Sequence, residues 1–223
     1  MVAILEKIRL ENFSVGGECD LFSYGKVSDC LRRNNFEFHT GNLYGIIGEF
    51  GNGGAALSCG ITGNTGYYGY YEGKVYIDGQ ESPLEHVIEN SWYIGMDLDN
   101  RKRFIKKRRT VRQQIEYGVH NTEQGGDAKK IQDIFRISEE RIDRNIKYVS
   151  GECWKASAAI GYANGRKIFC YPWMNSRDVE HLKEQLSYVV DYLIHSDCIV
   201  IFPTTKEDNI KKICSEYKLY YLE

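Results

Sequence analysis

The stretch Gly48-Glu49-Phe50-Gly51-Asn52-Gly53-Gly54-Ala55-Ala56 decides the fold that this sequence predicts. It follows the apolar run Leu43–Ile47, which is typical of a strand buried in a parallel sheet. It leads into Ala55–Ile61, whose composition allows a helix. A glycine-rich turn between a buried strand and a helix is the setting in which backbone N–H groups bind phosphate.

The side chains of this stretch differ from those of a working phosphate loop, G-x-x-x-x-G-K-[ST]. Gly48 and Gly53 have the required spacing, with Gly51 between them, but Gly54 stands at the lysine position and Ala55 at the hydroxyl position. Each missing charge-assisted contact removes roughly 1.5–3 kcal/mol, so nucleotide binding is expected to weaken by on the order of a hundredfold or more. The remaining backbone donors predict weak anion binding. A plain glycine-rich turn is the competing interpretation.

Length and composition narrow the class of protein. A chain of 223 residues with 42% hydrophobic residues is expected to form a globular domain with a sizeable core. Its net charge of −2 argues against a general nucleic-acid binder. The seven cysteines are scattered without a C-x-x-C pair, which favours buried thiols in a reducing compartment over zinc ligands or disulfides. The first residues are expected to form a strand and not a targeting segment, and no run is apolar enough to span a membrane.

Hydrophobic periodicity predicts strands that alternate with helices, which indicates an α/β fold with a mainly parallel sheet. The predicted strands lie near residues 2–10, 35–39, 43–48, 73–79, 91–96, 168–171, 198–202 and 219–222. The predicted helices lie near residues 55–61, 110–144 with an interrupting loop, 150–163, 177–194 and 210–214. The helix over 177–194 has the clearest apolar face. Ser150 is the expected N-cap of the helix over 150–163.

Eight short segments follow one another in a characteristic order along nearly the whole chain: Phe22–Gly25, Gly41–Gly48, Gly73–Gly79, Tyr93–Asp97, Thr110–Ile115, Val149–Cys153, Lys167–Tyr171 and Cys198–Phe202. In this order they resemble the conserved segments of an ABC-transporter ATP-binding subunit. The resemblance implies a P-loop NTPase-like core with an antiparallel β edge and a helical subdomain. It places the core at residues 1–97 and 166–223, and the helical subdomain at about 98–165, within a single ABC ATPase-like domain.

The resemblance also implies roles for particular residues. Tyr24 is expected to stack on adenine, beside the degenerate nucleotide loop formed by Gly48, Gly51, Gly53, Gly54 and Ala55. Ser150 and Gly151 fall in the signature segment, which in the family closes over nucleotide held by the opposite subunit. A basic run is expected to contact a permease or the membrane surface, through Arg101, Lys102, Arg103, Lys106 and Lys107.

The departures from the family pattern all concern the residues that bind magnesium or take part in hydrolysis. The strand over 168–171 leads into Tyr171, Pro172 and Trp173, where the family has an aspartate and a glutamate. The switch histidine is replaced within Pro203–Thr205, and Asp97 lies near the place of the Q-loop glutamine. Hydrolysis needs magnesium, an oriented water and charge neutralisation together. We therefore expect no catalytic residue, no metal site and no cofactor of its own on this chain.

Other interpretations remain open for several of these residues. Ser150 is explained equally by a simple helix cap, and Glu152 would lie unfavourably close to a phosphate at the signature segment. The run 101–109 also fits a solvated basic loop. Trp154 and Trp173 are hypothesised to fill space that a nucleotide would otherwise occupy.

The sequence thus predicts a catalytically degenerate ABC-type subunit of a membrane transport complex, with a structural or regulatory role. Its expected partners are transmembrane permease subunits and a second, active ATPase subunit, with no nucleic acid. The expected location is cytoplasmic, at the inner face of the membrane. One alternative is a nucleotide-binding sensor or weak ATPase that uses unorthodox residues, and another is a soluble interaction module.

Overall fold

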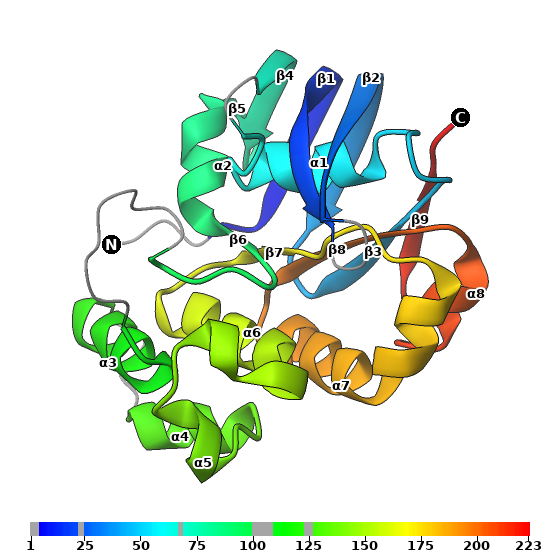
Figure 1. Ribbon diagram of the computed structural model, residues 1–223. Coiled ribbons are helices and arrows are strands. Elements are labelled where there is room, and N and C mark those ends of the chain that lie inside the picture. Colours follow the sequence, from blue (N-terminus) through cyan, green and yellow to red (C-terminus); the bar gives the residue numbers. More distant parts are fainter. Residues whose placement is uncertain (1–4, 22–24, 67–68, 100–108, 123–126) are drawn as a thin grey trace. The chain divides into compact units, whose positions relative to one another are not determined.

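The computed structural model describes residues 5–21, 25–66, 69–99, 109–122 and 127–223. The chain divides into two compact units (Figure 1). The first, here called the core unit, comprises Met1–Tyr93 and Lys167–Glu223, and the second, the helical unit, comprises Ile94–Arg166.

A parallel sheet forms the centre of the core unit. Its strands are ordered β6 (Ser91–Tyr93), β7 (Ile168–Cys170), β8 (Ile199–Thr204), β3 (Asn42–Ile47) and β9 (Lys218–Tyr221). Every residue of β6, β7 and β8 is buried, as apolar runs are when both faces of a parallel sheet are covered. The parallel sheet expected from the alternating strands and helices is confirmed.

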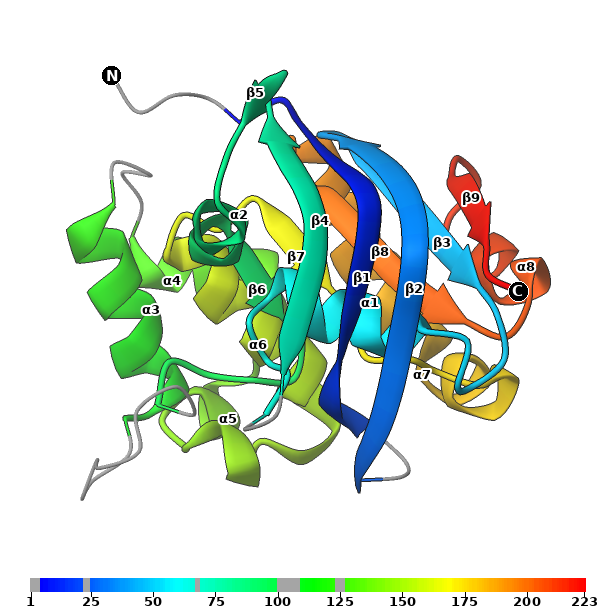
Figure 2. The same ribbon diagram turned by 90° about the horizontal axis from the view of Figure 1, so that it is seen from above.

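Helices cover the two faces of this sheet (Figures 1 and 2). Helix α1 (Gly54–Ile61) lies between the parallel sheet and a second sheet, and all of its residues are buried. Helices α7 (Ser176–His195) and α8 (Glu207–Lys211) cover the opposite face, and α2 (Leu84–Asn90) lies beside α1. The long amphipathic helix predicted over 177–194 is confirmed, because its apolar positions are the buried ones.

The second sheet of the core unit is antiparallel, with the order β2 (Gly25–His39), β1 (Lys7–Leu21), β4 (Tyr70–Ile77) and β5 (Gln80–Glu81). Strands β1 and β2 form a hairpin of two 15-residue strands. The sequence analysis expected only short strands near residues 2–10 and 35–39, which is wrong in extent. The far half of the hairpin carries glycines and polar residues, so it lacks the alternation by which strands are recognised.

The helical unit contains four α-helices and two short 3₁₀ turns among its described residues: α3 (Val111–Asn121), α4 (Ala128–Ile134), α5 (Glu139–Ile142), the turns Ile146–Tyr148 and Ser150–Glu152, and α6 (Cys153–Ala163). Thr110 and Gln113 begin α3 with a capping box, in which each side chain bonds the other residue's backbone. Gly118 lets α3 approach α6 closely, because a Cβ atom there would lie 2.6 Å from the carbonyl carbon of Ala163.

Tyr220 joins the edge strand β9 to β2. Its hydroxyl donates to the Glu37 carbonyl and accepts from the Glu37 N–H, both at 2.9 Å. Its ring packs edge-on against Phe36 and Phe38, and burial raises the pKa of its phenol.

Tyr220→Phe is therefore expected to lower the free energy of unfolding by about 1–3 kcal/mol, because it leaves the Glu37 backbone groups without their partner. Thermal unfolding followed by circular dichroism measures this. Tyr221→Phe is the matched control, since Tyr221 is 63% exposed and its hydroxyl bonds the side chain of Glu207 and no backbone group of a described residue. Equal melting temperatures for the two variants would contradict the expectation.

Candidate functional site

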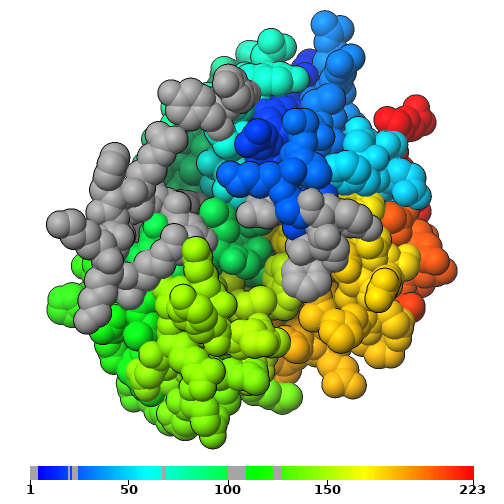
Figure 3. Space-filling model, viewed as in Figure 1, coloured from blue at the N-terminus to red at the C-terminus, as the bar shows by residue number. Residues whose placement is uncertain are grey.

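The glycine-rich loop lies at the carboxyl end of β3 and leads into α1, as the sequence analysis predicted. The Gly48 N–H donates to the Thr204 carbonyl at 3.0 Å, which fixes the start of the loop to the end of β8. Gly51 and Gly53 have φ angles of 99° and 95°, in the left-handed region that favours glycine. In the space-filling view the segment around the loop, coloured light blue to cyan, reaches the surface beside the C-terminal residues in red (Figure 3).

A carboxylate from the hairpin binds the backbone amides of this loop. Asp29 Oδ1 accepts from the Gly53 N–H at 3.1 Å and from the Cys30 N–H at 2.9 Å. Its Oδ2 accepts from the Ala56 N–H, in the first turn of α1, at 2.9 Å. Asp29 is only 6% exposed. Amides at the start of a helix attract anions, so here the chain's own side chain has taken the position of an external anion.

The sequence analysis did not identify Asp29 as part of the site. The residue lies 24 positions before Gly53, in a strand with no recognisable motif. Only the antiparallel pairing of β1 with β2 and the packing of α1 against both strands bring Asp29 to the loop.

The residues after Gly53 are enclosed by side chains from the ends of β7 and β8. A Cβ atom at Gly54 would lie 3.1 Å from Pro203 Cβ and 3.5 Å from Trp173 Cδ1. The Trp173 indole N–H donates to the Gly48 carbonyl at 3.1 Å, and Phe50 packs against its ring at a centroid distance of 5.5 Å. The side of the loop where a phosphate-loop lysine would extend is therefore filled by apolar side chains.

The end of β7 offers a phenol where the resemblance implied carboxylates. Tyr171 is fully buried, and its hydroxyl has no hydrogen-bond partner among the described residues. Burial raises the pKa of this phenol, because ionisation in an apolar interior is unfavourable. Tyr171 therefore remains neutral across the physiological pH range, and no acidic side chain follows it before Asp178.

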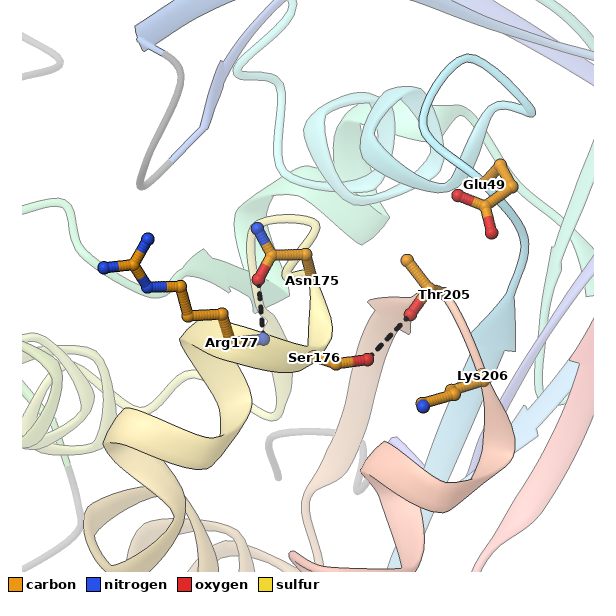
Figure 4. Close-up of a pocket in the computed structure, with 6 residues that line it drawn as sticks. All are labelled: Glu49, Asn175, Ser176, Arg177, Thr205 and Lys206. Atoms are coloured by element: carbon orange, nitrogen blue, oxygen red, sulfur yellow. Dashed lines mark hydrogen bonds between the residues drawn. The ribbon is translucent and has the colours of Figure 1, made fainter.

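A shallow pocket of 460 Å³ lies at the carboxyl ends of β3, β7 and β8 (Figure 4). Its lining residues are Glu49, Asn175, Ser176, Arg177, Thr205 and Lys206. Ser176 and Thr205 face each other with their hydroxyl oxygens 3.3 Å apart, and Arg177 points away from this pair. Asn175 caps α7 by accepting from the N–H groups of Arg177 and Asp178.

Comparisons with known proteins address the fold. The sequence matches no protein-family model and no curated protein. Among solved structures, it is similar to a putative ABC transporter ATP-binding protein from Pyrococcus furiosus, with 14% identity and a TM-score of 0.62 over 97% of each chain. A structure of the ATP-binding subunit of an ABC transporter has 13% identity and a TM-score of 0.62, over 99% of this chain and 86% of that one.

The chain has the fold of an ABC-transporter ATP-binding subunit. A bacterial Atm1-family ABC exporter with ATP bound is also similar, at 13% identity and a TM-score of 0.59, over the whole of this chain and 38% of that one. The α/β class, the P-loop NTPase-like core and the antiparallel sheet expected from the sequence are thus confirmed. Because these identities are low, the likeness concerns the fold, and the chemistry has to be argued from this chain's own residues.

The side chains of the loop do not fit the ATP and magnesium that the family resemblance implies. Its amides at Gly53 and Ala56 are bonded to Asp29, and Gly54 and Ala55 provide neither a cation nor a hydroxyl. No group of three or more His, Cys, Asp or Glu side chains among the described residues is arranged to hold a metal ion. Tyr24 lies outside the described residues, as do Arg101, Lys102, Arg103, Lys106 and Lys107 of the basic run.

The signature-like segment lies in the helical unit, and its serine is not the helix cap that the sequence predicted. Helix α6 begins at Cys153, and Ser150 lies in the preceding 3₁₀ turn with φ of 52°. Ser150 and Gly151 are exposed, and the Ser150 hydroxyl bonds no described residue. A serine caps a helix only when its oxygen reaches the free N–H groups of the first turn, and the extra turn prevents this.

Glu152 is turned into the helical unit. Its Oε2 accepts from the N–H and the hydroxyl of Ser138, and its Oε1 lies 3.5 Å from Arg141 and 3.7 Å from Lys155. Its side chain is 15% exposed. The carboxylate thus fixes the start of α5 and is neutralised within the unit, which removes the basis for the repulsion that the sequence analysis expected at this position.

Asp97, near the place of the Q-loop glutamine, is a buried structural residue. It accepts from the Asp99 N–H at 3.0 Å and from Gln114 Nε2 at 3.3 Å. Asp99 in turn binds the backbone N–H and the guanidinium of Arg109. The chain on both sides of residues 100–108 is therefore held by a buried acidic pair within the helical unit.

Glu152→Ala is expected to lower the free energy of unfolding by about 1–3 kcal/mol, because Ser138 loses its acceptor in a half-buried position. Glu139→Ala is the control, since its ion pairs with Lys129 and Arg112 are on the surface and contribute at most about 1 kcal/mol. Urea unfolding of both variants provides the comparison. A less stable Glu139→Ala beside an unaffected Glu152→Ala would show that Glu152 does not support the unit.

Proposed function

We propose that this chain is a non-catalytic ATP-binding-type subunit of a membrane transport complex. The proposal combines the ABC-subunit fold with one observation at the loop: Trp173 and Pro203 fill the space beside Gly54. Subunits of this fold generally pair with transmembrane permease components. None of the helices in the described part of this chain has the length and apolarity that crossing a membrane requires. In the proposed role, a permease holds the chain at the inner face of the membrane.

The side chains at the strand ends and at the start of α1 differ from those of a working nucleotide site. In a working site the strand ends carry carboxylates and the helix start carries a lysine and a hydroxyl. Here the strand ends carry Tyr171, Trp173 and Pro203, which pack against each other's strands and against the loop. Introducing the missing groups would require displacing buried apolar side chains, which costs about 1–3 kcal/mol for each overpacked position.

The proposed work is structural or regulatory. A second, active ATPase subunit supplies the hydrolysis, and this chain completes the dimer and holds the permease. Ser150 and Gly151 are exposed, so they are available for a contact with nucleotide bound by that partner. The Glu152 carboxylate is neutralised inside the helical unit, so it does not oppose this contact.

A second candidate function, a sensor of phosphate-bearing ligands, is favoured by the pocket of Figure 4. Lys206 lines this pocket with Ser176 and Thr205, and it forms no ion pair with a described residue, whereas Arg177 points away from the two hydroxyl groups. An unpaired cation near two hydroxyl groups is able to bind a phosphoryl group.

Isothermal titration of Mg-ATP into the purified chain separates the two candidates. The non-catalytic subunit is expected to give no binding heat, because the loop amides are occupied and no cation replaces the lysine. Micromolar binding that is lost in Lys206→Ala, and kept in the surface control Lys183→Ala, would overturn this expectation and favour the sensor.

Recovery of partners tests the transport role directly. A tagged chain extracted from gently solubilised membranes is expected to bring down a permease and a second ATP-binding subunit with an intact phosphate-loop lysine. Mass spectrometry of the recovered proteins gives the measurement. A chain that remains entirely in the soluble fraction, with no membrane protein recovered, would refute the proposal.

A further inference from the structure

Two cysteine side chains from different elements, here called the thiol pair, meet inside the core unit. Cys19 lies on β1 and Cys59 on α1, and neither residue has any exposed surface. Strand β1 crosses over this helix (Figure 2). The thiol of Cys59 contacts that of Cys19, and this contact is the main reason why the pKa of Cys19 lies far above its usual range. Thiols that are 40 positions apart in the chain are thus neighbours in the fold.

The backbone on both sides of the thiol pair is packed closely. A Cβ atom at Gly60, the residue after the helix cysteine, would lie 2.5 Å from Val15 Cγ2. The N–H of Glu18, the residue before the strand cysteine, donates to the Thr65 carbonyl beyond the end of α1 at 3.0 Å. Because Gly60 brings the helix close to the strand, a bond between the two sulfurs requires little movement of either backbone.

The end of the β1–β2 hairpin gives a reactant access to the thiol pair. Cys19 pairs with Val27, and only two further residue pairs of the two strands follow, the last of them Leu21 with Gly25. The ends of strands open locally at a much lower free energy than the whole fold. Opening of these pairs exposes Cys19 to a small solute, and closure returns it to Cys59.

We propose that the thiol pair is a redox switch, in which an oxidant of the peroxide class converts Cys19 and Cys59 into a disulfide between the hairpin and α1. Hydrogen peroxide first oxidises the Cys19 thiol to a sulfenic acid and releases one water. The Cys59 sulfur then attacks the sulfenic sulfur, the S–S bond forms, and the hydroxyl leaves with the Cys59 proton as a second water. The two thiols lose two electrons, and one peroxide gains them.

The disulfide acts on the glycine-rich loop through β2. Asp29 lies on β2 opposite Gly17 of β1, and its carboxylate binds the amides of Gly53 and Ala56. A covalent bond from β1 to α1 therefore keeps Asp29 on the loop and opposes any separation of the hairpin from the helix. The inference goes beyond the transport role, because it concerns how this chain responds to an oxidant.

The experiment maps the disulfides of the purified, reduced chain after treatment with hydrogen peroxide below its melting temperature. Thiols that remain free are alkylated in denaturant, and peptides from a non-reducing digest are identified by mass spectrometry. All seven cysteines are free in the structure, and the expected product joins Cys19 to Cys59. The disulfide is expected to raise the melting temperature by about 5–10 °C, and dithiothreitol is expected to reverse both changes.

Cys19→Ala removes the thiol pair, and Cys198→Ala is the matched control. Cys198 is equally buried in the same unit and its thiol donates to the Ser196 carbonyl, so the control loses a core thiol and keeps the pair. The peroxide-dependent rise in melting temperature is expected in Cys198→Ala and not in Cys19→Ala. A rise of equal size in both variants would show that a different pair of cysteines reacts, and the proposal would fail.

The peptide map of the wild-type chain decides the question even where a variant does not fold. Cys59 also lies near Cys170 of β7, so a Cys59–Cys170 disulfide is the competing product. That product, or a treated chain in which Cys19 and Cys59 are still alkylated, would overturn the proposal. Neither result affects the transport role, which rests on the fold and on Trp173.

Discussion

The hydrogen bonds between the Asp29 carboxylate and the backbone amides hold three parts of the core unit together. They join β2 of the antiparallel sheet to the turn after β3 and to the first turn of α1. Helix α1 has neither a side-chain cap at Gly53 nor an acidic residue in its first turn. Asp29 therefore supplies from a distance the negative charge that helix starts usually obtain from neighbouring residues.

The same loop is restrained from its other side by Trp173. The indole bonds the Gly48 carbonyl, while Pro203 lies against Gly54. A working phosphate loop leaves its amides open to bind an anion. Here both the amides and the adjoining space are occupied by the chain itself. The backbone turn of this fold is thus held by contacts within the chain itself.

Much of the fold could be predicted from the sequence because its signals are local. The apolar run before Gly48, the apolar run Cys198–Phe202 and the apolar face of α7 each indicate one element without reference to the others. The hairpin was predicted in part only, since Gly16 and its pairing partner Cys30 show no alternation that distinguishes strand from loop. Ser150 was misread as a cap because the one-turn 3₁₀ segment that it begins, directly before α6, has no sequence signal.

The candidate site, like the fold, could be predicted from the sequence only in part. The sequence by itself determined which groups are missing, since Gly54, Ala55 and Tyr171 lack the required functional groups in any conformation. The sequence suggested Trp173 as a residue that fills nucleotide space, but only the tertiary structure decided which groups it and Asp29 contact. Asp29, Trp173 and Pro203 are separated from the loop by 24, 125 and 149 positions in the chain, counted from Gly53, Gly48 and Gly54 respectively. Contacts at such distances depend on strand register and sheet order, which arise from the packing of the whole core unit and leave no trace in a local motif.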